Sequence, residues 1–268
     1  MTLDCAPAAV LAIGGTDSSG GAGLTRDAEM LAECGVAGTF VVTAVTAQCD
    51  ARVLAVQSMS PRIVREQIRA AFETHAVRAV KIGMLGTRDV IEAVADALPS
   101  RDGPPIVLDP VLAASSGGAL LEADALDALR ATLLPRAALI TPNLSEAASL
   151  LREGEAQDEA GMTAQAVRLR QHGPGAVLLK GGHADGTVSV DVLVGGGVDI
   201  ERLSSPRVAV RMRGTGCMLA SAIAAGLTLG MPLAEACRFG KRRIDSRLAR
   251  ACRVGSDGRG AHILHSRR

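Results

Sequence analysis

The strongest constraint on the fold is an alternation of short apolar runs with helical segments along most of the 268 residues. Runs typical of buried strands, rich in Ala, Val, Leu and Ile, recur at 8–13, 39–45, 53–56, 79–82, 105–108, 138–140 and 176–179. Segments with helical periodicity lie between them, at 22–33, 61–76, 87–98, 122–133, 143–151 and 163–171. This alternation is typical of βαβ units and predicts a mainly parallel sheet covered by helices.

The last third of the chain departs from strict alternation. The runs 188–194 and 198–203 are separated by three glycines, which predicts a hairpin. Two helices are expected at 217–229 and 233–251, and the polar stretch 153–161 is expected to be a surface loop. Large α/β domains reach this length as one unit, and no repeat or low-complexity linker interrupts it. We therefore expect a single domain over 1–268.

Composition narrows the function. Apolar residues make up 48% of the chain but aromatics only 1%, with three Phe and no Tyr or Trp. An aliphatic core suits helices packed on a parallel sheet, and the lack of aromatics argues against nucleic-acid modules that stack bases.

Lys and Arg total 29 and Asp and Glu 28, a net charge of +1, so no polyanion-binding surface is expected. The basic segment 241–253 is expected to be a solvated helix face, with a phosphate-attracting patch as the alternative.

The cysteines and the hydropathy pattern point to the cytoplasm. The six cysteines show no CxxC pairing and no His at metal spacing, which argues against a zinc site. Residues 1–9 lack a basic segment followed by a long apolar one, and no apolar stretch approaches the ~18 residues of a membrane helix. We expect reduced thiols, a cytoplasmic protein, and no membrane role.

Ligands of open α/β sheets bind beyond the carboxyl ends of the strands, so residues that follow strands are the candidates for chemistry. The segment 14–23 has five glycines and leads into a helix that carries Asp27. It matches neither GxGxxG nor GxxxxGK[ST], so a tight turn and a ligand-binding loop both remain open. Asp27 falls in the first helical turn, where it either complements the helix dipole or reaches a polar ligand atom.

Two further strand ends offer groups for a flat, polar ligand. Gln48 has both a donor and an acceptor, which suits the edge of a heteroaromatic ring. Met84 can pack on such a ring through its thioether. Alternatively, Gln48 is an ordinary polar loop residue and Met84 packs in the hydrophobic core.

Carboxylates follow two more strands. Asp109 suits a metal or a phosphate-handling group, with a structural role as the alternative. Asn143 and Glu146 have the spacing of a capping box at a helix start. Alternatively, Glu146 contacts a Mg²⁺–water network, because Mg²⁺ bound with nucleotide phosphates uses few carboxylates and many waters.

The strongest signal is 213–218, which runs into an Ala-rich helix. Two glycines at a helix N-terminus expose N–H groups where the dipole favours negative charge, so Gly214, Thr215 and Gly216 form a candidate anion hole. The same field is expected to lower the pKa of Cys217, which would help it take a hydroxyl proton. Lys180, at a strand end beside two glycines, is a candidate phosphate ligand. The alternative is a close-packed helix start with an inert cysteine.

Together these segments resemble the hydroxymethylpyrimidine and phosphomethylpyrimidine kinase family of the ribokinase-like superfamily. The resemblance covers about residues 9–245, in family order, with matches at 12–23, 42–48, 81–84, 107–111, 141–146, 180–183 and 214–217.

The resemblance implies a three-layer α/β/α sandwich and an ATP- and Mg²⁺-dependent homodimer. It implies phosphorylation of 4-amino-5-hydroxymethyl-2-methylpyrimidine, or of its monophosphate, in thiamine biosynthesis. The residues that it assigns to the pyrimidine are Gly15, Asp27, Gln48, Met84 and Val111. Those that it assigns to catalysis, the nucleotide and Mg²⁺ are Gly214, Thr215, Gly216, Cys217, Lys180, Asn143, Arg213, Asp109 and Glu146.

The chain departs from the family pattern at two positions beside the anion hole. The family usually has His and Thr where this chain has Arg213 and Met218. The adenine side and the segment 255–265 match only loosely. Two alternatives therefore stand beside the pyrimidine kinase: a pyridoxal or pyridoxine kinase on the same scaffold, and a non-catalytic pyrimidine-binding regulatory domain.

Overall fold

A nine-stranded sheet forms the centre of the computed structural model, which describes residues 7–99, 102–114, 118, 120–122, 124–182, 187–208, 212–253 and 261–262. The strands are β1 (Ala8–Asp17), β2 (Ala37–Gln48), β3 (Val53–Ser58), β4 (Ala76–Ile82), β5 (Ile106–Leu108), β6 (Leu139–Ile140), β7 (Ala176–Lys180), β8 (Val188–Gly195) and β9 (Val198–Pro206). Their order is β3-β2-β1-β4-β5-β6-β7-β8-β9.

The six central strands are parallel, and the three others are antiparallel at the two edges. β2, β1, β4, β5, β6 and β7 pair in parallel, whereas β3 lies antiparallel to β2, and β8 and β9 add an antiparallel pair beside β7. The expected mainly parallel sheet and the 188–203 hairpin are confirmed. A separate pair, β10 (Cys252–Arg253) with β11 (Ala261–His262), was not predicted, because two-residue strands carry no periodicity.

Eight α-helices, within the described part of the chain, cover the sheet. They are α1 (Gly23–Glu33), α2 (Pro61–Thr74), α3 (Arg88–Ala97), α4 (Ala125–Ala128), α5 (Leu144–Leu151), α6 (Glu159–Gln171), α7 (Thr215–Thr228) and α8 (Leu233–Ala249).

Two helices differ from the sequence prediction. The helix expected at 122–133 is α4 followed by a π turn (Leu129–Leu133) and a 3-10 turn (Leu134–Arg136). The Thr132 hydroxyl donates to the Ala128 carbonyl oxygen (2.7 Å), and this side-chain bond competes with the regular helical pattern. α6 begins at Glu159 instead of 163, because the Asp158 carboxylate accepts the Gly161 N–H (2.7 Å) as an N-cap.

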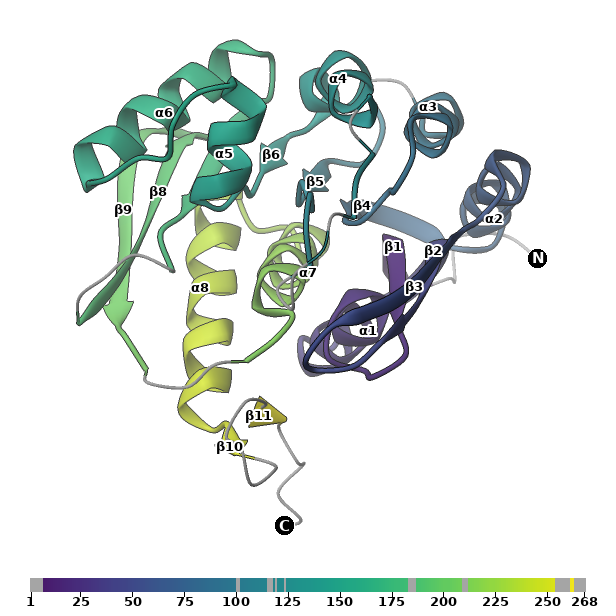
Figure 1. Ribbon diagram of the computed structural model, residues 1–268, viewed down its shortest axis with the longest axis horizontal. Coiled ribbons are helices and arrows are strands. Elements are labelled where there is room, and N and C mark those ends of the chain that lie inside the picture. The colour runs from purple at the N-terminus through teal and green to yellow at the C-terminus, as the bar shows by residue number, and fades with distance from the viewer. Residues whose placement is uncertain are drawn as a thin grey trace.

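The helices form two layers (Figure 1). One apolar cluster joins α2–α6 to strand residues such as Leu11, Ile82 and Leu108. The other cluster joins α1, α7 and α8 to Val10 and Val107. These two residues precede Leu11 and Leu108 in the sequence and face the opposite side of the sheet. Because successive side chains of a strand point to opposite faces, the aliphatic strand runs supply both clusters. The expected three-layer α/β/α sandwich is confirmed.

The expectation of a fully solvated basic face on α8 was wrong at two positions. Lys241 is buried and its Nζ lies 2.9 Å from an Asp191 carboxylate oxygen on β8. Arg247 is buried against α1, with ion pairs to Glu29 (2.5 Å) and Glu33 (2.7 Å). These contacts are far apart in sequence, so the local charge pattern gave no sign of them. None of the described helices is both long and apolar enough to cross a bilayer.

Two glycines that flank α1 both adopt positive φ, but in different surroundings. Gly23 has φ of 62°, and a Cβ there would lie well inside van der Waals contact of the Gly15 carbonyl oxygen. Gly35 has φ of 71°, and a Cβ there would meet no atom within 4 Å. Backbone strain is therefore common to both positions, whereas the steric clash is specific to Gly23.

We predict that Gly35→Ala lowers the free energy of unfolding by about 1–2 kcal/mol, the cost of the left-handed conformation. Gly23→Ala should cost about 1–3 kcal/mol more, because the β1–α1 loop must move. Urea unfolding followed by circular dichroism measures both. Equal losses in the two variants would contradict the close approach of Gly23 to Gly15.

Candidate active site

The glycine-rich segment between β1 and α1 folds into a compact loop fixed by Asp17. One oxygen of this buried carboxylate accepts the Ser19 N–H (2.9 Å) and the Ser19 hydroxyl (2.7 Å), and the Gly20 N–H donates to the Asp17 carbonyl oxygen (2.9 Å). Since Asp17 ends β1, it holds the loop at the carboxyl end of the sheet. The loop contains the tight turn that the glycines suggested, and it borders the start of α7.

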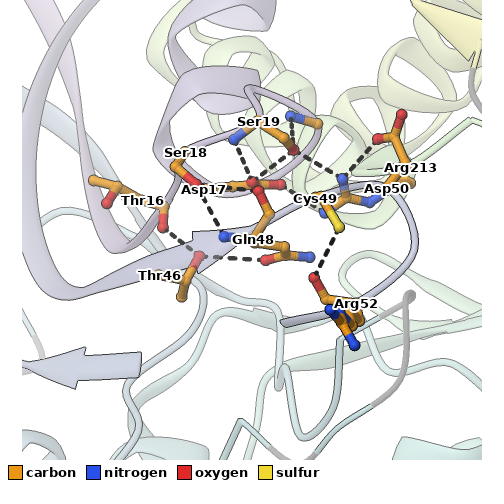
Figure 2. Close-up of polar contacts among 11 residues, drawn as sticks. Thr16, Asp17, Ser18, Ser19, Thr46, Gln48, Cys49, Asp50, Arg52 and Arg213 are labelled. Atoms are coloured by element: carbon orange, nitrogen blue, oxygen red, sulfur yellow. Dashed lines mark hydrogen bonds and ion pairs between the residues drawn. The ribbon is translucent and has the colours of Figure 1, made fainter. Parts of the chain in front are cut away.

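Arg213 joins this loop to two other segments (Figure 2). Its Nη2 lies 2.7 Å from Asp17 Oδ2, and its Nη1 lies 2.9 Å from the Ser19 hydroxyl and 3.0 Å from Asp50 Oδ1. Asp50 lies in the turn between β2 and β3. The guanidinium therefore connects the segment before α7 to the β1–α1 loop and to the β2–β3 turn.

A fully buried polar cluster lies beneath the first turns of α7. Lys81 Nζ on β4 is 2.8 Å from Asp27 Oδ2 on α1, and the Ser221 hydroxyl of α7 donates to Asp27 Oδ1 (2.8 Å). Burial is the largest single effect on Lys81 and acts against its charged form, but Asp27, Cys217 and Asp109 together outweigh it and raise the pKa of Lys81, so Lys81 stays protonated. Asp27 was assigned to pyrimidine contact; here both of its oxygens are engaged inside the protein, and that assignment stays a prediction.

A second lysine–carboxylate pair lies at the ends of β5 and β7. Lys180 Nζ is 2.8 Å from Asp109 Oδ1, which also accepts the Thr141 hydroxyl (3.0 Å). Gly216 lies directly above this pair, because a Cβ there would be 3.1 Å from Lys180 Nζ and 3.5 Å from Asp109 Oδ2. The geometry brings together three residues that the sequence assigned to phosphate, metal and anion hole.

Glu146 is held near the same lysine by a capping box at the start of α5. The Asn143 side chain accepts the Glu146 N–H, and Glu146 Oε2 accepts the Asn143 N–H, both at 2.8 Å. Lys180 Nζ lies 4.0 Å from Glu146 Oε2. Burial raises the pKa of Glu146 to about 7; Lys180 opposes this rise and Asp109 adds to it. The Glu146 carboxylate can therefore cap α5 and also lie beside Lys180, because the same oxygen, Oε2, makes both contacts.

The N-terminus of α7 has the geometry expected of an anion hole. Gly214 precedes the helix with φ of 73° and provides no side-chain cap, so no side-chain acceptor at that position occupies the first helical N–H groups. A Cβ at Gly214 would lie 2.7 Å from the Gly21 carbonyl oxygen, which fixes the helix start against the β1–α1 loop. Gly216, in the first turn of α7, lies against Lys180 and Asp109, so this helix start borders the ends of β5 and β7.

The prediction that the helix field lowers the pKa of Cys217 was wrong. Desolvation is the dominant effect and raises the pKa of this thiol to about 11; Lys81 and a hydrogen bond from the Gly23 N–H oppose the rise without reversing it. Asp27 and Asp109 add negative charge that disfavours the thiolate. At neutral pH in the ligand-free protein, Cys217 is a thiol and not a base.

The residues assigned to the pyrimidine lie at the same edge of the sheet as the anion hole. A Cβ at Gly15 would lie 2.8 Å from Met84 Sδ, so these two assigned positions are in contact. Gln48 ends β2, where its backbone N–H donates to the Ser18 hydroxyl oxygen (2.9 Å) and its Oε1 accepts the Thr46 hydroxyl (3.3 Å). Val111 follows Asp109, and its N–H donates to the Asp109 carbonyl oxygen (2.8 Å). Their roles in binding stay predictions.

Sequence reasoning gave no role to Lys81, Asp17 or Ser221. A lysine in the apolar run 79–82 was the available signal for Lys81, because a buried charge requires a partner. Asp17 and Ser221 gave no such signal, since their contacts depend on segments that meet only in the folded chain. His183, which belonged to the resemblance, lies outside the described residues.

Comparison with known proteins identifies the family. A family model described as phosphomethylpyrimidine kinase matches residues 17–262. A hydroxymethylpyrimidine/phosphomethylpyrimidine kinase of Rhizobium meliloti is 44% identical over 261 residues, which are 96% of this chain and 97% of the relative. The chain belongs to the phosphomethylpyrimidine kinase family.

Solved structures agree with the family assignment. A phosphomethylpyrimidine kinase from Clostridium difficile has a TM-score of 0.78 at 36% identity, covering 90% of this chain and 99% of that one. A pyridoxal kinase from Staphylococcus aureus, in complex with AMP-PCP and pyridoxal, has a TM-score of 0.84 at 26% identity, covering 97% and 94%. The resemblance stated from the sequence motifs is confirmed.

A Mg²⁺ ion that binds together with nucleotide phosphates needs few ligands from the protein, because phosphate oxygens and water complete its coordination. Among the described residues, no group of three or more His, Cys, Asp and Glu side chains is placed to hold a metal ion. Asp109 and Glu146, which flank Lys180, remain the candidate carboxylates for Mg²⁺.

We predict that Cys217 reacts with iodoacetamide on the order of a hundred times more slowly than Cys49 at pH 8, because the thiolate is the nucleophile. Cys49 is exposed in the β2–β3 turn, and hydrogen bonds from neighbouring backbone N–H groups lower the pKa of its thiol. Peptide mass spectrometry over time measures both sites in one sample. Comparable rates would contradict the raised pKa of Cys217.

Proposed function

We propose that this family member transfers the γ-phosphoryl group of ATP to the hydroxymethyl group of 4-amino-5-hydroxymethyl-2-methylpyrimidine, and then to the resulting monophosphate. The observation that carries the proposal is the contact of Gly216, in the exposed N-terminus of α7, with the Lys180–Asp109 pair. Curated relatives over nearly the whole chain have names with this activity. The thiamine enzymes of Geobacter sulfurreducens and Arabidopsis thaliana, which are longer, contain similar segments.

The proposed chemistry assigns charge stabilisation to the backbone and Lys180. The acceptor oxygen forms a bond to the γ-phosphorus while the bond to the bridging oxygen breaks; ADP retains that electron pair, and the hydroxyl proton passes to an oxygen of the transferred phosphoryl group. Amide N–H groups of 215–217 and the Lys180 ammonium are fixed donors for the equatorial oxygens. A loose transition state needs little help from a base, which is consistent with a protonated Cys217 that orients the hydroxyl group.

Mg²⁺ fits the carboxylates beside Lys180. Burial raises the pKa of Glu146 to about 7, so part of this side chain is protonated near neutral pH. A cation bound beside it would favour the ionised carboxylate. Asp109 and Glu146 would hold the ion, largely through water, and Asn143 lies on the same side through the capping box. When bound, the ion neutralises phosphate charge.

Pyridoxal is the second candidate substrate. The pyridoxal kinases of Bacillus subtilis and Staphylococcus aureus share the fold, with TM-scores of 0.84 to 0.86 at 26–28% identity. Both substrates present a hydroxymethyl group on a nitrogen heterocycle, so the fold alone does not separate them. The higher identity to pyrimidine kinases favours the pyrimidine.

The test measures ADP release from ATP and Mg²⁺ with the hydroxymethylpyrimidine, its monophosphate or pyridoxal. We expect turnover with both pyrimidines, and a loss of at least about tenfold in kcat/KM in Lys180→Ala and in Cys217→Ala. Cys34→Ala is the matched control, because Cys34 is half-buried at the end of α1, outside the proposed site.

Three results would contradict parts of the proposal. Turnover of pyridoxal alone would reassign the substrate. No turnover with any substrate, while the pyrimidine still binds, would favour the regulatory-domain alternative. Unchanged rates in both the Lys180 and the Cys217 variant, with normal thermal unfolding, would remove the mechanism.

We also propose a homodimer that uses the β2–β3 edge. The end of β2 and the adjacent β3 expose the apolar side chains of Val45, Leu54 and Val56. Exposed apolar side chains on an edge hairpin favour burial against a partner. Light scattering after size-exclusion chromatography should give twice the mass of the 27.4 kDa chain, and Leu54→Glu should give the monomer. A monomeric parent protein at micromolar concentration would contradict the dimer.

A further inference from the structure

Both Nη atoms of Arg213 bond to acceptors within the protein, whereas its buried Nε has no hydrogen-bond partner among the described residues. Its side chain is 10% exposed, and the two Nη atoms contact Asp17, Ser19 and Asp50 at 2.7 to 3.0 Å. A Cβ at Gly21 would lie 2.6 Å from Nη1, so the guanidinium also lies flat against the loop backbone. A side chain in this position has little freedom to turn towards a nucleotide.

Charge balance argues in the same direction. The single positive charge of Arg213 lies beside two carboxylates, Asp17 and Asp50, so the group has a formal charge of −1 (Figure 2). A phosphate would meet a guanidinium whose charge is already balanced by the buried Asp17 carboxylate. Lys180 Nζ contacts one carboxylate at 2.8 Å, that of Asp109, and lies 4.0 Å from Glu146, beside Gly216 at the start of α7, so it is the better placed cation for a phosphate.

The three segments that Arg213 joins carry different parts of the proposed site. The next residue, Gly214, begins the anion hole, and Asp17 and Ser19 fix the β1–α1 loop. Asp50 lies two residues after Gln48, whose N–H is itself held by the neighbouring Ser18 hydroxyl. The Arg213 contacts therefore link the pyrimidine side of the site to the phosphate side.

We propose that Arg213 is a positioning residue that holds the β2–β3 turn and the β1–α1 loop against the anion hole. This inference rests on the proposed kinase function. The Asp17 contact, buried on both sides, fixes the loop and the α7 start. The Asp50 contact, whose carboxylate is 41% exposed, holds the turn that presents Gln48 and is the weaker, salt-sensitive one.

The two contacts predict different kinetic effects. Asp50→Asn should raise KM for the hydroxymethylpyrimidine about three- to fivefold, with KM for ATP unchanged, as expected for a partly exposed ion pair. Arg213→Ala should raise the same KM and lower kcat about tenfold or more, because the buried Asp17 loses its partner. Asp50→Asn should have a smaller effect when made in Arg213→Ala than when made alone, because the contact between the two residues is already lost.

Two variants serve as references. Asp199→Asn removes an exposed carboxylate from β9, far in sequence from the proposed site, and should leave both KM values unchanged. Arg213→Lys keeps the positive charge, but its single ammonium group cannot contact both Asp17 and Asp50. Compared with Arg213→Ala, it should recover more of the lost kcat than of the raised KM for the pyrimidine. A general loss of stability would not separate these two parameters.

A rise in KM for ATP in Arg213→Ala, with no effect of Asp50→Asn, would overturn the inference and make Arg213 a phosphate ligand. Additive effects in the double variant would overturn it as well. Hydrogen exchange tests it even if the protein proves inactive. Amides of 18–21 and 49–52 should exchange faster in Arg213→Ala than in the parent protein, and unchanged exchange would refute the positioning role whatever the activity.

Discussion

Two buried lysine–carboxylate pairs determine how the candidate site is assembled. Lys81 with Asp27 and Lys180 with Asp109 place charges beneath α7, where an unpaired charge would be strongly destabilising. Each pair also contacts α7 or its first turn: Ser221 donates to Asp27, and Gly216 lies against Lys180. The exposed amides of the helix start are therefore fixed by polar contacts from α1, β4, β5 and β7, and the glycines of the segment allow that close approach.

The sequence predicted the sheet and nearly all of the helices, because buried aliphatic runs and helical periodicity are local properties. It also predicted that 14–23, Gln48, Asp109 and Lys180 lie at one edge, because parallel strands end on the same side. Their partners could not be predicted. Lys81 and Asp27 are 54 residues apart, Lys180 and Asp109 71, and Arg213 and Asp17 196, and no local pattern records such pairings. The burial of Lys241 and Arg247 was missed for the same reason.

Cys217 shows why a correct local argument gave the wrong sign. The helix N-terminus does favour a thiolate, and so do Lys81 and the Gly23 N–H. These effects are smaller than the cost of removing the thiolate from water, and two nearby carboxylates add to that cost. Sequence reasoning identified the favourable field but had no measure of burial. Desolvation is likewise the largest effect on Glu146, whose pKa it raises.

The long-range contacts also have a consequence for synthesis on the ribosome. Asp27 and Lys81 can meet once β4 has left the exit tunnel, but Ser221 and Arg247 are made some two hundred residues after their α1 partners. Until then, the face of the sheet that α7 and α8 later cover presents Val10, Ala79 and Val107 without its final layer. The nascent chain therefore leaves part of this apolar face uncovered until α7 and α8 have been synthesised, and exposed apolar surface of this kind favours aggregation of incomplete chains.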